Sequence, residues 1–113
     1  MNVVEMTPGE KIPYVVNKNK ITFDDELTLN VQKLERDFDV VIDVCIDKYG
    51  MLTAGTLGLK YAAQIEIPAR QYTEKESENP DYDPDDENSR ETITEREPVP
   101  FSMDNVTLKL YAI

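Results

Sequence analysis

The sequence predicts an all-β protein: a single small antiparallel sandwich or barrel-like sheet of about six strands, with a long acidic loop. Three observations support this fold class. Apolar and polar side chains alternate on both sides of an acidic segment, β-branched residues dominate a third segment, and no long stretch has helical periodicity. With 113 residues, the chain has the length of one domain.

The first third of the chain indicates a short hairpin. Residues 12–16 and Lys20–Phe23 flank the polar trio Asn17-Lys18-Asn19. This trio suits a tight turn because asparagine tolerates the left-handed backbone conformation. Pro13 has no backbone N–H to donate, which confines the first strand to a sheet edge.

A third strand is predicted over residues 26–31, where apolar and polar side chains alternate again. The side chains expected to face inward are Leu27, Leu29 and Val31. Residues 32–39 favour a charged loop or a single helical turn, since Leu34 and Phe38 are four residues apart.

Residues 40–47 are predicted to form a strand because they are densely β-branched. One face carries Val40, Ile42, Val44 and Ile46, and the other carries Val41, Asp43, Cys45 and Asp47. Residues 47–50 then indicate a turn, with Gly55 and Gly58 as further loop positions. The chain is expected to reverse between Ile46 and Leu57.

Residues 57–67 and 106–112 are predicted to pair as antiparallel strands, with the acidic segment as their connection. In the first, Pro68 ends an alternation whose inward members are Leu57, Leu59, Tyr61, Ala63, Ile65 and Ile67. In the second, the inward members are Val106, Leu108, Leu110 and Ala112.

One modest core is expected from the apolar faces of these strands. Its predicted members are Val15, Ile21, Phe23, Leu27, Leu29, Val40, Ile42, Val44, Ile46, Leu59, Tyr61, Ile65, Val106, Leu108 and Leu110.

The formal net charge of −11 is concentrated in one segment. Residues 72–97 hold 11 acidic and three basic side chains, a net charge of −8, whereas the other 87 residues carry −3. We therefore expect one β domain, residues 1–113, with residues 73–90 as a mobile acidic insertion between its last two strands, because so few apolar side chains cannot offset the entropy of ordering. Such an insertion is either an arm that contacts a basic partner or a solvated segment that keeps the protein soluble.

Residue types argue against catalysis and against a bound cofactor. The chain has no His, no Trp and one Cys, Cys45, which removes His-based acid–base chemistry and Cys/His zinc sites. Neighbouring carboxylates are expected to raise the pKa of the Cys45 thiol. Residues 81–85 begin like a calcium loop, but Asp86 stands where glycine is needed and Thr92 where a bidentate Glu is needed. No enzyme activity, metal or cofactor is predicted.

These exclusions favour a non-catalytic protein–protein interaction or structural module, a description typical of small phage or mobile-element accessory components. The alternative is an acidic inhibitor that occupies a basic nucleic-acid-binding groove of a target protein. The expected partner is a protein, and one alternative is a protein with a basic surface. A homo-oligomer is a further alternative. Direct binding to nucleic acid or to a membrane is not expected, because the charge is negative and no apolar stretch approaches about 20 residues.

Acidic side chains interleaved with tyrosine suit a partner rich in Arg or Lys. The candidate partner-binding residues are Tyr72, Asp81, Tyr82, Asp83, Asp85, Asp86 and Glu87. Because the N-terminus has no positively charged leader and the one thiol is free to stay reduced, a cytoplasmic location is expected, in the encoding cell or in a host.

Overall fold

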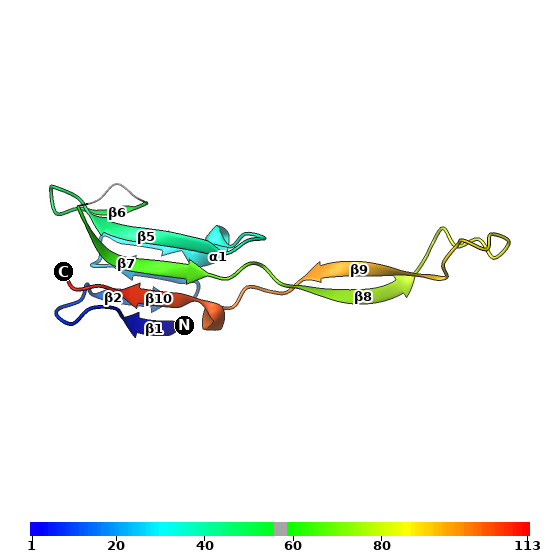
Figure 1. The fold of residues 1–113 in the computed structure, drawn as a ribbon, viewed down its shortest axis with the longest axis horizontal. Coiled ribbons are helices and arrows are strands. Elements are labelled where there is room, and N and C mark those ends of the chain that lie inside the picture. The colour runs from blue at the N-terminus through cyan, green and yellow to red at the C-terminus, as the bar shows by residue number, and fades with distance from the viewer. Residues whose placement is uncertain (56–58) are drawn as a thin grey trace. The chain divides into compact units, whose positions relative to one another are not determined.

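The computed structural model describes residues 1–55 and 59–113, and its strands fall into three sheets. The largest has the order β1 (Asn2–Glu5), β10 (Thr107–Leu110), β7 (Lys60–Ile67), β5 (Val40–Ile46) and β6 (Leu52–Ala54). A second has the order β2 (Tyr14–Asn17), β3 (Lys20–Phe23) and β4 (Leu27–Asn30). The third is a ribbon of β8 (Tyr72–Glu78) and β9 (Thr92–Pro98) (Figure 1).

The chain divides into two compact units. The body comprises residues 1–70 and 101–113 and contains the two larger sheets, α1 (Val31–Leu34) and the 3-10 turn η1 (Met103–Asn105). The ribbon unit comprises residues 71–100 and contains β8 and β9. Among the described residues, no helix is long and apolar enough to cross a membrane.

The predicted all-β class is confirmed, but the single antiparallel sheet of about six strands is wrong. The described residues contain ten strands, the largest sheet is open with β1 and β6 at its edges, and β1 pairs with β10 in parallel. The two edge strands have weak sequence signals because all four side chains of β1 are exposed and β6 has three residues. The pairing of β1 with β10 is a long-range contact that no local pattern encodes.

The remaining strands of the body lie where alternation and β-branching predict them. β7 and β10 pair antiparallel, with Ile65 opposite Leu108. β2 and β3 form the expected hairpin, β2 lies at a sheet edge, and α1 is the single helical turn that was one of the two alternatives. The expected positions Leu57 and Gly58 lie outside the described residues.

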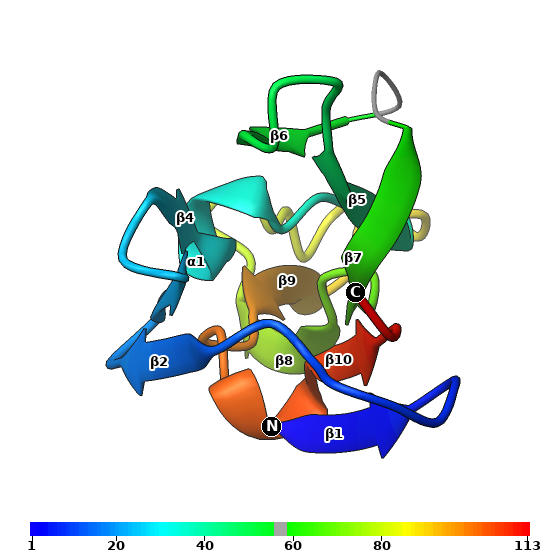
Figure 2. The same cartoon turned by 90° about the vertical axis from the view of Figure 1, so that its left-hand side faces the viewer.

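Side chains from both sheets of the body form one core. Ile21 and Phe23 of β3 are fully buried, and so are Val44 of β5, Ile65 of β7 and Leu108 of β10. Figure 2 shows β2, β4 and α1 on one side of the body and β5, β7 and β10 on the other. Twelve of the 15 predicted core residues are buried in this cluster or packed against it.

A β-bulge explains why two predicted core residues of the 57–67 segment, Leu59 and Tyr61, are exposed. Val44 pairs with Ala63, but the next residue, Cys45, pairs with Tyr61, so Ala62 is an extra residue in β7. Ala62 is itself fully buried. The extra residue reverses the inward and outward positions toward the start of β7, and Tyr61 and Leu59 are 46% and 76% exposed.

Val15 is the third predicted core residue that is exposed, at 60%. Its neighbour Val16 lies opposite the buried Ile21, and Val15 lies opposite Thr22. Since successive side chains of a strand point to opposite faces, Val15 shares the outer face of the sheet with Thr22. Val16 is also exposed, at 40%, so neither valine of the pair belongs to the core.

Part of the acidic segment expected as an insertion over residues 73–90 forms a β-strand. Residues 73–78 belong to β8, and β9 follows at Thr92–Pro98, so the connection shortens to residues 79–91. Few side chains of the ribbon unit are even partly buried. Strand formation there is therefore driven by cross-strand pairing, which apolar periodicity does not reveal.

Truncating two leucines that were both predicted to lie in the core should show which of them is buried. Leu108→Ala should lower the free energy of unfolding by about 2–5 kcal/mol, because Leu108 is fully buried. Leu59→Ala should change it by less than about 0.5 kcal/mol, because Leu59 is exposed. Urea denaturation of both variants measures the difference, and equal losses would contradict the placement of the bulge.

Candidate functional site

The ribbon places side chains of opposite charge directly across from one another. β8 and β9 pair antiparallel, with Glu74 opposite Arg96 and Lys75 opposite Glu95. Each such pair contributes roughly 0.2–1 kcal/mol to a sheet. All seven residues of β9 are exposed, as are five of the seven in β8. The ribbon unit thus has paired strands with both faces open to solvent.

Hydrogen bonds at both ends of the ribbon determine which backbone N–H groups of β8 point toward β9. The Val99 N–H donates to the Gln71 carbonyl at 2.8 Å, and the Asn79 N–H donates to the Glu91 carbonyl at 2.9 Å. Hydrogen-bonded and non-hydrogen-bonded pairs alternate along an antiparallel ladder. The N–H of Ser77 therefore points toward β9, and the N–H groups of the residues on either side of it point away from β9, toward the open edge of β8.

A proline and a cation–π contact lie at the base of the ribbon. Pro98 lies opposite Tyr72, at a non-hydrogen-bonded pair, where the missing N–H costs no ladder bond. The Arg96 guanidinium lies over the Tyr72 ring, 4.4 Å from its centroid. This contact is worth roughly 0.5–1 kcal/mol at an exposed site, so Tyr72 contributes to the ribbon itself.

The tip of the ribbon, residues 79–91, is ordered by short local hydrogen bonds. The side-chain oxygens of Asn79, Asp83 and Asp86 each accept from the backbone N–H two residues further on, at 2.9–3.0 Å. Turns of this kind are typical of Asn and Asp. The Asn79 side-chain NH₂ also donates to the Arg90 carbonyl at 2.8 Å, which joins the two sides of the tip.

Six of the seven candidate residues come together in this tip and one does not. Those in the tip are exposed: Asp81, Tyr82, Asp83, Asp85, Asp86 and Glu87. Tyr72 begins β8, and at about 3.4 Å per residue it lies roughly 20 Å along the strand from the tip. Among the described residues, no three His, Cys, Asp or Glu side chains converge as metal ligands would.

A second polar surface covers the outer face of the five-stranded sheet. The Gln64 side-chain NH₂ donates to the Asp43 carboxylate at 2.8 Å, and its oxygen accepts from the Tyr111 hydroxyl at 2.6 Å. Lys109 lies opposite Gln64 and reaches diagonally to Glu66, two residues further along β7, with 2.6 Å between the ammonium and the carboxylate. This hydrogen bond raises the pKa of the Lys109 ammonium. Sequence alternation placed these residues outward but did not reveal their partners.

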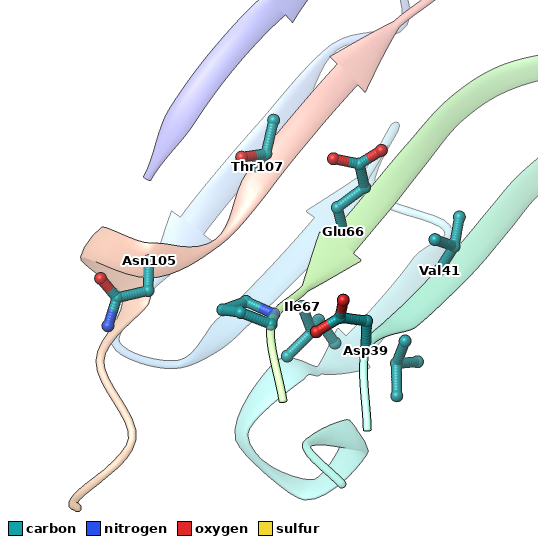
Figure 3. Close-up of a pocket in the computed structure, with 8 residues that line it drawn as sticks. Asp39, Val41, Glu66, Ile67, Asn105 and Thr107 are labelled. Carbon is teal, nitrogen blue, oxygen red and sulfur yellow. The ribbon is translucent and has the colours of Figure 1, made fainter. Parts of the chain in front are cut away.

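A depression of about 320 Å³ lies beside these residues, where Val41, Glu66 and Thr107 stand in a row across β5, β7 and β10 (Figure 3). The two carboxylates that line the depression are engaged by other groups of the body. The Asp39 carboxylate accepts from the Ala69 N–H at 2.8 Å, and the Glu66 carboxylate pairs with Lys109. The depression offers a ligand apolar contact and hydrogen-bond acceptors.

The pKa of the Cys45 thiol is raised, as the sequence predicts, but burial is a larger cause than the neighbouring carboxylate. The side chain is 3% exposed, and its thiol donates to the Gly55 carbonyl at 3.5 Å. Burial raises the pKa of the Cys45 thiol, and the negative charge of Asp43 raises it further. Both effects disfavour the thiolate, which is the nucleophilic form.

Two proline substitutions should test the pairing of the ribbon. Ser77→Pro should disrupt pairing between β8 and β9 because it removes an inward N–H, whereas Glu76→Pro should be milder because that N–H faces the edge. Amide hydrogen exchange of residues 72–78 reports the pairing, and the urea midpoint of the body should stay unchanged in both. Equal exchange rates in the two variants would refute this ladder.

Alkylation should show the suppressed reactivity of Cys45. At neutral pH, iodoacetamide should modify the folded protein at least about tenfold more slowly than the protein in urea, because few thiols are ionised and the sulfur is covered. Asp43→Asn should lower the thiol pKa and speed the reaction slightly, since burial is the larger cause. Mass spectrometry follows the adduct, and equal rates with and without urea would contradict the burial.

Comparison with models of known protein families finds no match, and searches of curated protein sequences and of solved structures find none either. The features that bear on function are therefore those of the chain itself: an acidic ribbon with exposed faces and a body whose outer sheet face carries a polar network.

Proposed function

We propose that this protein is a non-catalytic interaction module and that the ribbon unit is the arm that docks on a basic surface of a partner protein. The observation that carries the proposal is a regular, paired ribbon with a net charge of −8 and little burial of its own.

Stability supports this proposal. A two-stranded ribbon is marginally stable in water unless a further strand or surface covers it. The described core belongs entirely to the body. A partner that covers one face of the ribbon, or pairs with one of its edges, supplies the burial that the ribbon lacks.

Charge supports a basic partner. The tip alone exposes five candidate carboxylates, Asp81, Asp83, Asp85, Asp86 and Glu87. Charges of one sign on an exposed element attract a partner of the opposite sign before contact and raise the association rate, by about tenfold or more. Tyr82, which is 42% exposed, adds a ring that a Lys or Arg side chain can cover.

The inhibitor alternative gains support from the regularity of β8. Glu74, Glu76 and Glu78 occupy alternate positions of one strand and therefore share one face. Their spacing of about 7 Å follows from two strand residues per repeat. A row of evenly spaced carboxylates suits a groove that binds a phosphate backbone, and a duplex oligonucleotide that displaces the captured partner would favour this alternative.

Neutralising the tip should remove the partner without disturbing the fold. In the variant Asp81→Asn, Asp83→Asn, Asp85→Asn, Asp86→Asn, Glu87→Gln, the amide oxygens can still accept the turn hydrogen bonds while five charges are lost. Capture of a partner from lysate, quantified by mass spectrometry in low and high salt, should fall at least about tenfold.

The matched control removes the same number of charges from exposed positions of the body. It carries Glu5→Gln, Glu10→Gln, Asp24→Asn, Asp25→Asn and Asp104→Asn. This control should capture the partner as well as the unmodified chain does. Full capture by the neutral-tip variant would show that the tip carboxylates do not make the contact and would end their proposed role.

A further inference from the structure

The opposite charge to the tip gathers at one end of the three-stranded sheet. Between residues 11 and 23 the sequence has three lysines and no acidic residue. Two of these lysines line an open depression of about 340 Å³, formed where the turn between β2 and β3 meets the end of β4 and the start of α1. The lining residues are Asn17, Lys18, Asn19, Lys20, Asn30 and Gln32.

The sheet register sets Lys20 at the centre of this site. Asn17 and Asn30 are its cross-strand neighbours on the two sides. Lys20 alternates with the buried Ile21, so all three side chains stand on the outer face of the sheet. The Lys20 side chain thus has an amide-bearing residue beside it on each neighbouring strand.

Hydrogen bonds within the site orient its amides. The Gln32 side-chain oxygen accepts from the Asn19 side-chain NH₂ at 2.9 Å, and the Asn30 side-chain oxygen accepts from the Lys33 N–H at 3.3 Å. With their oxygens engaged by the protein, Gln32 and Asn30 present NH₂ groups as donors. Two ammonium groups and two amide donors suit an anion with several acceptor oxygens.

Backbone strain accompanies the placement of Lys18. Its φ is +55°, in the left-handed region that disfavours side chains with a Cβ. The two flanking asparagines tolerate this region better, yet the lysine occupies it. The two-residue turn between β2 and β3 requires this conformation at its first position, and the turn thereby fixes where the Lys18 side chain leaves the backbone.

We propose that this depression, the lysine site, binds the acidic tip of a second copy of the same chain. The inference rests on the proposed function of the ribbon and names the basic surface that the tip meets. Charge complementarity carries it: carboxylates crowd the tip of the ribbon, and ammonium and NH₂ groups line the lysine site. A nucleic acid is a poorer occupant because the two lysines of the site, Lys18 and Lys20, neutralise only about two phosphates.

Each copy offers one tip and one lysine site, so the contact is heterologous. Copies add head to tail, and the series either closes into a ring or continues as a chain. Long-range repulsion between acidic copies is screened beyond about 8 Å at physiological ionic strength, while pairs in direct contact persist. Exposed pairs are individually weak, so association should require high protein concentration.

Sedimentation velocity of the full chain, from about 10 µM to about 1 mM in about 0.15 M salt, tests the proposal. The mean sedimentation coefficient should rise with concentration. Lys18→Glu with Lys20→Glu should abolish the rise. The matched control, Lys48→Glu with Lys60→Glu, reverses two exposed lysines elsewhere on the body and should keep it.

A charge exchange makes the test specific. The variant Asp81→Lys, Asp85→Lys, Glu87→Lys reverses the tip but leaves Asp83 and Asp86, which hold the turns, unchanged. Alone it should stay monomeric, because a basic tip meets a lysine site. Mixed with Lys18→Glu, Lys20→Glu it should restore association. An unmodified chain that stays monomeric at about 1 mM, or a mixture without rescue, would overturn the proposal.

The variant Lys18→Gly distinguishes the effect of backbone strain on stability from the role of the lysine side chain in self-association. Glycine adopts positive φ freely, so this variant should raise the melting temperature by about 4 °C while weakening self-association several-fold. If the lysine site binds a labelled oligonucleotide and Lys18→Glu, Lys20→Glu leaves self-association intact, the self-docking proposal is wrong.

The two proposals fail separately. Tip-dependent capture of another protein by a chain that never self-associates would end the self-docking inference and leave the arm intact. Capture that survives neutralisation of the tip would end the proposed role of the tip as the docking element.

Discussion

The antiparallel pairing of β7 with β10 is the constraint on which the body depends. β5 joins the other edge of β7, and β1 joins the other edge of β10. The paired residues Ile65 and Leu108 are both fully buried, so hydrophobic burial stabilises the contact that closes the fold. The whole ribbon unit lies between these strands in the sequence. Because the entropic cost of closing a loop rises only with the logarithm of its length, such an insertion adds little to the cost of forming this pair.

The bulge in β7 lets one strand serve two different surfaces. C-terminal to Ala62, its inward residues pack in the core, and its outward residues Gln64 and Glu66 join polar partners on β5 and β10 or just beyond. At the bulge, Ala62 and Ala63 are both buried, and small side chains allow two successive residues to face the core. At the start of the strand the Tyr61 side chain therefore points outward, and its ring centroid lies 5.8 Å from the ring centroid of Tyr111.

The elements that the sequence predicts correctly are those that one short-range pattern decides. β-branching predicted β5, and alternation together with Pro68 predicted the end of β7. The features that local patterns do not predict depend on distant contacts: the parallel partner of β1, the extra residue at Ala62 and the cross-strand charges of the ribbon. The candidate site divides in the same way. Charge density predicted the tip, but Tyr72 was grouped with it although the strand separates them, and the lysine site was missed because β2, β3, β4 and α1 each supply part of it.

Separating the charge from the core is physically favourable for both units. Like charges destabilise a compact state through their mutual repulsion, and the body, with nine basic against 12 acidic residues, is nearly balanced. The ribbon holds the excess, yet opposite charges face each other at Glu74 and Arg96 and at Lys75 and Glu95 along its strands. Repulsion is left mainly in the tip, where Asp83 and Asp86 spend part of their acceptor capacity on turns. The tip lies roughly 20 Å along the strands from the ribbon base, more than two Debye lengths at physiological salt, so its charge acts on an arriving partner more than on the base of the ribbon.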